Sequence, residues 1–448
     1  MRLTAVILAA GQGTRMKSTT PKVLHPLAGQ PLVSYAVDAA TRVTGVAPVL
    51  VVGHGGDQVR EALGDRARYV TQAEQLGTGH AVLQARTLLA GEADAVLVTY
   101  ADMPLVTEST LQKMVAGYQH DGVMSFLTVI AQDPRGFGRV VRDDTGQPQR
   151  VVEESSCTPE QLSIRELNAG VYCFNADWLW ENLAKLSPSP KGEYYLTDMV
   201  GLAVSQGHPA TAIQTTDASE LIGINTRVHL AEAEAVIRAR INRRWMEAGV
   251  TLLDPVTTYI ESTVTIAPDT IILPNTHLRG RTTIGSHCRI GPNTVLEDSQ
   301  IGSNCLVTMS VLEGAVMEDD ANIGPFGHLR KGARLCRGAH MGNFGEMKNA
   351  TLGPGGKMGH FSYLGEAQIG ANVNIGAGTI TCNFDGVHKN VTVIEDDVFI
   401  GSDSMLVAPV HIGRGAKTGA GSVVTHDVPA GAVVYGVPAR PKRPAGEE

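Results

Sequence analysis

The sequence predicts two domains of different fold class joined by a helix: an α/β doubly wound domain, a linker helix, and a parallel β-helix. Up to about residue 226, short apolar runs alternate with helical stretches, which is typical of βαβ units. From Val264 almost to Tyr435, an aliphatic residue returns every six positions. That period fits neither a helix, with about 3.6 residues per turn, nor an ordinary strand, whose side chains alternate. We therefore expect domains at 1–226 and 250–448, with the linker helix at 227–249.

Composition excludes several classes of protein. The chain has 448 residues, 43% of them hydrophobic, and a net charge of −8, so we expect a soluble globular protein without general affinity for nucleic acid. Its six cysteines show no CxxC pair and no disulfide-framework spacing, which favours a reducing cytoplasm. No apolar run approaches about 18 residues and no signal peptide is recognisable, so we expect no membrane insertion.

The first half contains three apolar runs that we expect to be buried strands and three stretches that we expect to be helices. The strands are 5–8, 49–52 and 95–99, and the helices are 32–43, 78–89 and 109–118. This alternation predicts a parallel sheet, which binds its ligands outside the carboxyl ends of its strands.

A glycine-rich turn follows the first predicted strand. Gly11 and Gly13 leave the backbone bare, so its N–H groups can approach phosphate oxygens closely. Arg15 and Lys22 add positive charge that suits a triphosphate. The turn does not match a dinucleotide fingerprint, because Met16 occupies the third glycine position.

The turn, together with the Pro-Lys pair at 21–22, resembles the signature of sugar-phosphate nucleotidyltransferases, the pyrophosphorylases that make nucleotide sugars. This resemblance implies catalytic roles for Arg15 and Lys22. It also implies contacts with the nucleotide from Leu8, Ala9, Ala10, Gly11 and Lys22. The run 72–80 resembles the uracil-binding segment of the family, with Gln72, Gly77 and Thr78 as contacts. The alternative for this run is a glycine turn followed by a helix-capping threonine.

The end of the third predicted strand, Tyr100-Ala101-Asp102, resembles a further binding segment of that family, with Ala101 in place of the usual glycine. A lone carboxylate there suits Mg²⁺, which takes one or two protein oxygens and leaves its other positions to phosphates and water. Asp102 and Asn225 match the metal ligands of the family. The alternatives are that Asp102 caps the following turn and that Asn225 caps the following helix.

Three later segments resemble the part of the family's pocket that holds the sugar hydroxyls and the N-acetyl group. The residues that match are Gly138, Glu153 and Asn168. Taken singly, each is an ordinary turn or an exposed polar side chain, but they occur in the order of the family. The following stretch, 227–248, carries glutamates early and arginines late, which favours a helix because these charges complement the helix dipole.

The second half carries two long hexad ladders. They are Ile323, Leu329, Leu335, Met341 and Met347, and Ile394, Ile400, Leu406, Ile412, Thr418 and Val424. We expect a solenoid of triangular coils in which each hexad supplies one side, so that one coil uses about eighteen residues. The period is suspended between Ile375 and Ile394, and we expect segment 381–390 to form a functional loop.

Four motifs of the second half, at 343–348, 359–365, 374–386 and 399–403, resemble a narrower family. This is the family of bacterial bifunctional UDP-N-acetylglucosamine pyrophosphorylases/glucosamine-1-phosphate N-acetyltransferases, and the likeness covers nearly the whole chain. It implies a left-handed β-helix, a homotrimer, and a nucleotidyltransferase (uridylyltransferase) domain followed by an acetyltransferase domain. The substrates that it implies are UTP, sugar 1-phosphates and acetyl-CoA, with Mg²⁺ as cofactor.

The same family implies site residues in the second half. His360 is the candidate general base, because imidazole can accept a proton near neutral pH. The residues that match ligands for the sugar phosphate or acetyl-CoA are Arg330, Lys348, Tyr363, Asn374, Ala377, Asn383, Phe384, Ser402 and Ala420. Phe384 stands where a tyrosine is common, Arg440 has no secure match, and Cys382 has no supported role. Outside the motifs, such residues would be charged or packed surface residues.

The resemblance implies two reactions: acetylation of glucosamine 1-phosphate, then uridylyl transfer to the product, which yields UDP-N-acetylglucosamine for peptidoglycan, lipopolysaccharide and other envelope precursors. One alternative is a single-activity nucleotidyltransferase whose β-helix is a scaffold. Another is a solenoid that only binds partners, which would leave Arg15, Lys22 and Asp102 without a purpose. Because one coil offers no enclosed pocket, we expect the acetyl-transfer site to close only between neighbouring subunits.

Overall fold

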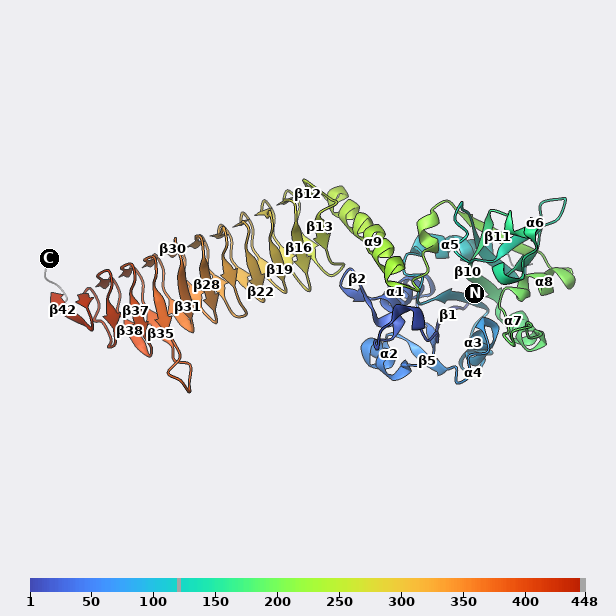
Figure 1. Cartoon of the computed structure of the whole chain (residues 1–448), viewed down its shortest axis with the longest axis horizontal. Coiled ribbons are helices and arrows are strands. Elements are labelled where there is room, and N and C mark those ends of the chain that lie inside the picture. Colours follow the sequence, from blue (N-terminus) through green and yellow to red (C-terminus); the bar gives the residue numbers. More distant parts are fainter. Residues whose placement is uncertain (119–121, 444–448) are drawn as a thin grey trace. The chain divides into compact units, whose positions relative to one another are not determined.

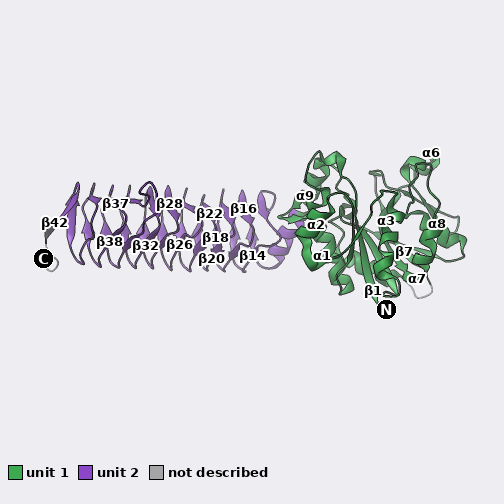
Figure 2. Cartoon of the chain, turned by 90° about the horizontal axis from the view of Figure 1, so that it is seen from below, with its two compact units in different colours: residues 1–237 green, residues 238–448 purple. Residues whose placement is uncertain are grey.

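The computed structural model describes residues 1–118 and 122–443. The chain divides into two compact units, Met1–Ile237 and Arg238–Glu448 (Figure 2). The division falls inside helix α9 (Arg227–Glu247), which occupies the stretch where the sequence predicts a linker helix. Among the described residues, no helix has the length and apolar character needed to cross a bilayer.

Unit 1 is built on a mixed sheet that has nine strands in the described part of the chain. Its centre is β1 (Leu3–Ala9), which pairs in parallel with β4 (Val49–Val52) on one side and β6 (Ala95–Tyr100) on the other. β5 (Arg68–Thr71) extends the sheet beyond β4. The three strands expected from sequence are therefore confirmed, and their carboxyl ends lie at one edge of the sheet.

The expectation of a parallel sheet is wrong for two of these nine strands, β10 (Glu166–Asn175) and, in the hairpin that precedes it, β9 (Pro148–Val152). β10 lies between β6 and β7 (Met124–Ile130) and runs antiparallel to both. Between β7 and β10 the chain forms the hairpin β8 (Arg139–Arg142) and β9 and the short α6 (Pro159–Leu162). Because no helix crosses the sheet in this connection, β10 enters from the opposite end. The last strand, β11 (Ala210–Thr215), is parallel to β7.

Helices cover both faces of this sheet, as a doubly wound fold requires. Alternate residues of β1 point into two separate cores, Ile7 into one and Val6 into the other. The first core contains α1 (Leu32–Thr44), α2 (Gly56–Leu63) and α5 (Glu108–Gly117). The second contains α3 (Thr78–Gln84), α4 (Arg86–Leu89), α7 (Ala176–Asn182) and α8 (Asp198–Ser205). The helix expected at 78–89 is therefore two short helices that meet at Ala85.

Unit 2 is a parallel β-helix made of three sheets, with 12, 10 and 9 strands in the described part of the chain (Figure 1). From β12 to β40 each sheet takes every third strand, so three consecutive strands complete one coil. Ile323 pairs with Met341, eighteen residues on, and Leu335 pairs with Leu352, seventeen residues on. The predicted ladder is confirmed, since all five members of its first run are at most 2% exposed.

A loop leaves the solenoid between β34 (Ile380–Cys382) and β35 (Thr392–Ile394), and Figure 1 shows it protruding from the coils. This is where the hexad period is suspended. The loop begins at Asn383, two residues later than expected, because the buried Thr381 hydroxyl bonds to the backbone of Gly365 and holds its strand in the coil.

Candidate functional site

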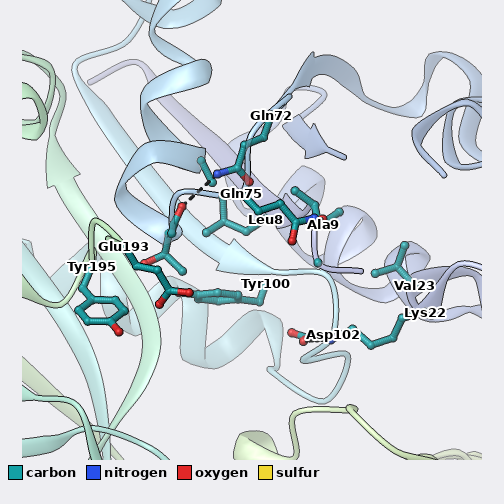
Figure 3. A pocket seen from close by; sticks show the side chains of 15 residues that line it. Leu8, Ala9, Lys22, Val23, Gln72, Gln75, Tyr100, Asp102, Glu193 and Tyr195 are labelled. Carbon is teal, nitrogen blue, oxygen red and sulfur yellow. Dashed lines mark hydrogen bonds and ion pairs between the residues drawn. The ribbon is translucent and has the colours of Figure 1, made fainter. Parts of the chain in front are cut away.

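Two cavities adjoin each other at the carboxyl edge of the unit 1 sheet. Cavity A has a volume of about 300 Å³ and cavity B about 420 Å³. Cavity A is lined by Leu8, Ala9, Ala10, Gly11, Lys22, Gln72, Gln75, Gly77, Thr78, Tyr100, Asp102, Glu193 and Tyr195, among others (Figure 3). Cavity B is lined by Arg15, Thr78, Tyr100, Asp102, Gly138, Glu153, Asn168, Tyr195, Thr197, Asn225 and His229, among others. They share Thr78, Tyr100, Asp102 and Tyr195, so one extended ligand can occupy both.

An ammonium group bridges two oxygens where the cavities meet. Lys22 Nζ lies 2.5 Å from Asp102 Oδ2 and 2.9 Å from Asn225 Oδ1. The Lys22 side chain is only 8% exposed, and Figure 3 shows it reaching toward Asp102. Gly13 has a φ of +65°, and a Cβ there would lie 2.7 Å from Lys22 Cβ. The glycine turn and the lysine are therefore packed together, which explains the need for glycine at that position.

Thr226, and not Asn225, takes the role of helix cap that was one of the two expectations for Asn225. Thr226 Oγ1 accepts a hydrogen bond from His229 N at 3.2 Å, which is the usual geometry of a helix N-cap. Because Thr226 caps α9, the Asn225 side chain remains available for the cavity. Its carbonyl oxygen and one oxygen of Asp102 converge on the same positive charge.

The segment from Gln72 to Thr78 is fixed by its own hydrogen bonds. Gln72 Nε2 donates to Gly77 O at 3.1 Å (Figure 3), and Thr78 Oγ1 accepts from Leu196 N at 2.9 Å. Thr78 is thus the first residue of α3 and not its cap. Gly77 has a φ of +98°, and a Cβ there would lie 2.6 Å from Tyr194 O. These contacts hold a concave wall of cavity A.

Cavity B presents a partly buried carboxyl and a buried amide. Glu153 accepts a hydrogen bond from Thr197 Oγ1 at 2.8 Å, and burial raises the pKa of this carboxyl above its usual range. Asn168 is 4% exposed and donates to Tyr172 Oη at 2.8 Å. Such groups suit a neutral polyhydroxylated ligand, because they can both donate and accept hydrogen bonds.

The structure brings all but one of the predicted residues of the first half to these cavities. The exception is Ala101, which is fully buried in the first core behind the cavity wall. Sequence reasoning missed Gln75, Glu193, Tyr195, Thr197 and His229. Gln75 lies inside the recognised run 72–80, and its Nε2 donates to Ala10 O at 2.7 Å; the run 193–198, rich in polar and aromatic residues, was a further usable signal.

The oxygens of Asp102 and Asn225 fit a divalent cation that takes few protein ligands. Both lie within hydrogen-bond distance of one ammonium, so they already converge on a single cationic point. Among the described residues, no cluster of three or more His, Cys, Asp or Glu side chains could hold a metal by itself. The remaining positions of such a cation would therefore belong to phosphate oxygens and water.

Unit 2 gathers cations on its 10-stranded sheet. Arg330 and Lys348 occupy neighbouring coils, because the preceding residues Leu329 and Met347 pair directly. Lys389, on the protruding loop, lies beside Lys348 and lowers its pKa, since two ammonium groups repel. Sequence reasoning missed Lys389, although it lies in the predicted functional loop. Like charges held together in this way suit an anionic ligand.

Carboxylates pair with two of these cations, Arg330 and Lys389. Arg330 Nη1 donates to Glu346 Oε1 at 2.9 Å, and Lys389 Nζ lies 3.7 Å from Glu366 Oε1. Asn383, which is 8% exposed, also donates to Glu366. Tyr363 lies on the same sheet, paired with Glu346 on the preceding coil. Phe384 is 60% exposed on the loop.

Four predicted residues form one column at the corner between the 12-stranded and 10-stranded sheets. His360 and Ala377 each follow by two positions the paired residues Met358 and Ile375. Ser402 follows Ile400, the pairing partner of Ile375, by two positions, and Ala420 occupies the same place on the next coil. His360 is exposed, and its Nδ1 lies 3.4 Å from Asn343 Oδ1. The column therefore carries an accessible imidazole followed by small residues.

The remaining predicted residues of unit 2 lie on two different faces of the β-helix. Asn374 lies on β33 (Asn374–Ile375) of the 12-stranded sheet, whereas Arg330, Lys348 and Tyr363 lie along the 10-stranded sheet. Cys382 carries a thiol whose pKa is raised by burial, which does not favour a reactive thiolate.

Comparison with known proteins agrees with both units. Residues 5–214 match the family of MobA-like NTP transferase domains. Residues 263–298 and 392–426 match the bacterial transferase hexapeptide repeats, so the solenoid is the left-handed β-helix of hexapeptide-repeat proteins.

Curated relatives extend over nearly the whole chain. The bifunctional protein GlmU of Heliobacterium modesticaldum is 49% identical over 432 residues, covering 96% of this chain and 94% of its own. That of Stutzerimonas stutzeri is 48% identical over 439 residues, covering 97% and 96%. That of Pelobacter propionicus is 46% identical over 436 residues, covering 96% and 94%. The chain thus belongs to the family of the bifunctional protein GlmU.

Proposed function

We propose that this enzyme makes UDP-N-acetylglucosamine in two steps, one in each unit. In unit 2, glucosamine 1-phosphate is acetylated by acetyl-CoA. In unit 1, the product attacks UTP and pyrophosphate leaves. The observation that carries the proposal is the presence in one chain of two separate polar sites, Lys22–Asp102–Asn225 and the cations beside the His360 column.

In unit 1, cavity A takes UTP and cavity B takes the sugar phosphate. The segment 72–78 holds the uracil, and Glu153 and Asn168 hold the sugar hydroxyls and the N-acetyl group. The phosphate oxygen of the sugar then attacks the α-phosphorus of UTP in line, opposite the leaving pyrophosphate. Arg15 and Lys22 stabilise the developing negative charge, so catalysis here is positioning and electrostatics.

A divalent cation, which we assign as Mg²⁺, would be held by Asp102 and Asn225. When bound, it neutralises charge on the phosphate oxygens and orients them. The convergence of these two oxygens on one ammonium supports this assignment.

In unit 2, Arg330, Lys348 and Lys389 bind the phosphate of glucosamine 1-phosphate. His360 removes a proton from the sugar ammonium, and the resulting amine attacks the thioester carbonyl of acetyl-CoA. The amide forms, the carbon–sulfur bond breaks, and CoA leaves as the thiol. Ala377, Ser402 and Ala420 line the path of the CoA arm along the corner column, with Asn383 and Phe384 beside it.

We further propose that the enzyme is a homotrimer whose acetyl-transfer site closes between neighbouring subunits. The division of Asn374 from Arg330 and Lys348 between two faces of one chain supports this. The enzyme is assigned to the cytoplasm. Its six cysteines, all within the described residues, carry free thiols, which agrees with that assignment.

The test is a single incubation of the purified protein with glucosamine 1-phosphate, acetyl-CoA, UTP and Mg²⁺, followed by mass spectrometry. We expect UDP-N-acetylglucosamine, free CoA and pyrophosphate. If product forms only when acetylated sugar phosphate is supplied, unit 2 is a scaffold and the two-step proposal is wrong. A fully active monomer in analytical ultracentrifugation would contradict the shared acetyl-transfer site.

A further inference from the structure

Lys22 makes its closest contacts with the two side chains that are assigned to the divalent cation. Its Nζ lies 2.5 Å from Asp102 Oδ2 and 2.9 Å from Asn225 Oδ1. The Asp102 carboxylate and the Asn225 amide oxygen are also the groups that would hold the cation. Two of the three N–H groups of the ammonium are thus directed at this site.

The ammonium and a divalent cation exclude each other at these oxygens. Mg²⁺ bonds to oxygen at about 2.1 Å, so a cation on Asp102 Oδ2 could lie no farther than about 4.6 Å from an unmoved Lys22 Nζ. Two positive charges at that separation repel, and the side chains are poorly screened, since Lys22 is 8% and Asp102 21% exposed. Lys22 in this position therefore opposes binding of the cation.

In the nucleotide-free protein, departure of Lys22 would leave a buried ammonium without its carboxylate, which is costly. A triphosphate changes this balance. Lys22 lines cavity A next to Ala10 and Gly11, where backbone N–H groups and the ammonium can receive phosphate oxygens together. The ammonium then exchanges one anionic partner for another.

We propose that Lys22 is a built-in substitute for the divalent cation, which keeps the cation off unit 1 until nucleotide phosphates draw the ammonium away. This inference rests on the proposed metal and nucleotide sites of unit 1. Nucleotide and cation then bind with positive coupling, and by linkage each raises the affinity for the other. The lysine also keeps Asp102 and Asn225 positioned when no ligand is bound.

The test measures cation binding, not catalysis. Mn²⁺ is titrated into the full-length protein without nucleotide, and free Mn²⁺ is followed by electron paramagnetic resonance. Lys22→Met removes the charge and keeps most of the side-chain volume, so we expect it to bind Mn²⁺ at least tenfold more tightly than the wild type. Lys17→Met, which neutralises an exposed lysine near the same turn, should behave as the wild type. Adding Asp102→Asn to Lys22→Met should abolish the gain.

The proposal is overturned if Lys22→Met gains no affinity, or if its gain persists without the Asp102 carboxylate. Should Lys22→Met not fold, as judged by the fluorescence of Trp178 and Trp180, the wild type decides. Mn²⁺ binding that depends on Asp102 in the absence of nucleotide refutes the inference, and such binding only with UTP present supports it. The proposed function fails separately, when the wild type with UTP, acetylated sugar phosphate and Mg²⁺ forms no nucleotide sugar.

Discussion

Replacement of His360 by alanine should remove most acetyl transfer and leave the fold intact. The side chain is exposed, and its ring nitrogen Nδ1 makes one long contact of 3.4 Å with Asn343 Oδ1. Loss of such a contact changes the free energy of unfolding by roughly 0.5 kcal/mol or less. The hydrophobic ladder beneath it, including Met358, remains complete. The substitution therefore tests chemistry and not stability.

The expected loss follows from the role of a general base. Proton transfer by a positioned side chain contributes roughly 10²- to 10⁴-fold to a rate, which corresponds to about 2.7–5.5 kcal/mol of transition-state stabilisation. We expect kcat for acetyl transfer to fall by this factor in His360→Ala. The KM for glucosamine 1-phosphate should change little, because the proposed phosphate contacts, Arg330 and Lys348, are unaltered.

Two assays on one preparation test whether His360 acts in acetyl transfer alone. Release of CoA thiol reports acetyl transfer, and release of pyrophosphate reports uridylyl transfer. His328→Ala is the matched control, because this half-exposed histidine lies on the same solenoid and pairs with Glu313 instead. Retention of more than a tenth of the acetyl-transfer rate in His360→Ala would refute its role as the base. Equal loss of both activities would refute the assignment of one reaction to each unit.

Four further outcomes follow from the structure. Asp102→Ala should lower uridylyl transfer by roughly a thousandfold and leave CoA release unchanged, because it removes the assigned cation ligand of unit 1 only. Lys389→Met should raise the KM for glucosamine 1-phosphate by roughly tenfold, through loss of one charge-assisted contact. Burial raises the pKa of Glu153 above its usual value of 4.5, so the folded protein holds this proton more tightly than the unfolded chain. The resulting contribution to the free energy of unfolding is full below pH 4.5 and is lost as pH rises through the raised pKa. Glu153→Gln should therefore reduce the fall in stability over this pH range, as measured by urea unfolding followed by tryptophan fluorescence. Leu329→Ala, at a fully buried ladder position, should cost roughly 2–5 kcal/mol in denaturant unfolding of unit 2.

The Lys389 and Leu329 variants each have a matched control. Arg337→Met removes an exposed cation of unit 2 that pairs with Asp320 at 3.1 Å, and its KM should match the wild type. Val311→Ala truncates a 38%-exposed residue of the same sheet as Leu329, and should cost about 0.5 kcal/mol or less. A Leu329 variant no less stable than the Val311 variant would contradict the stacked core. An unchanged pH dependence in Glu153→Gln would show that this carboxyl is not buried in solution.

The solenoid could be predicted in detail because its cause is local. Each hexad places an aliphatic residue such as Leu329 inside the coil, and its neighbours six positions away do the same, so the pattern is visible without knowing the fold. The direction of β10 could not be found in this way. An apolar strand has the same local pattern whether it runs parallel or antiparallel, and only its connection through the β8–β9 hairpin reverses it.

In the candidate site too, local features could be predicted from the sequence and contacts between distant residues could not. The residue types of Lys22, Asp102 and Asn225 were recognisable, but their direct contact was not, because they are separated by tens to hundreds of residues and meet only at the sheet edge. Tyr195 and Lys389 lie on irregular segments that carry no periodic signal. Tyr195 reaches the site only because its segment folds back to the cavities, and Lys389 only because its loop folds back beside Lys348.

The corner column of unit 2 has a consequence for the size of the donor. Adjacent strands of a sheet lie about 4.8 Å apart, so the three coil steps from His360 to Ala420 span roughly 14 Å along the solenoid axis. The side chains after His360 in this column, Ala377, Ser402 and Ala420, are all small. Under the proposed function, the column favours a long, slender donor arm whose reactive end lies at the imidazole, and a short acyl thioester would contact only its first step.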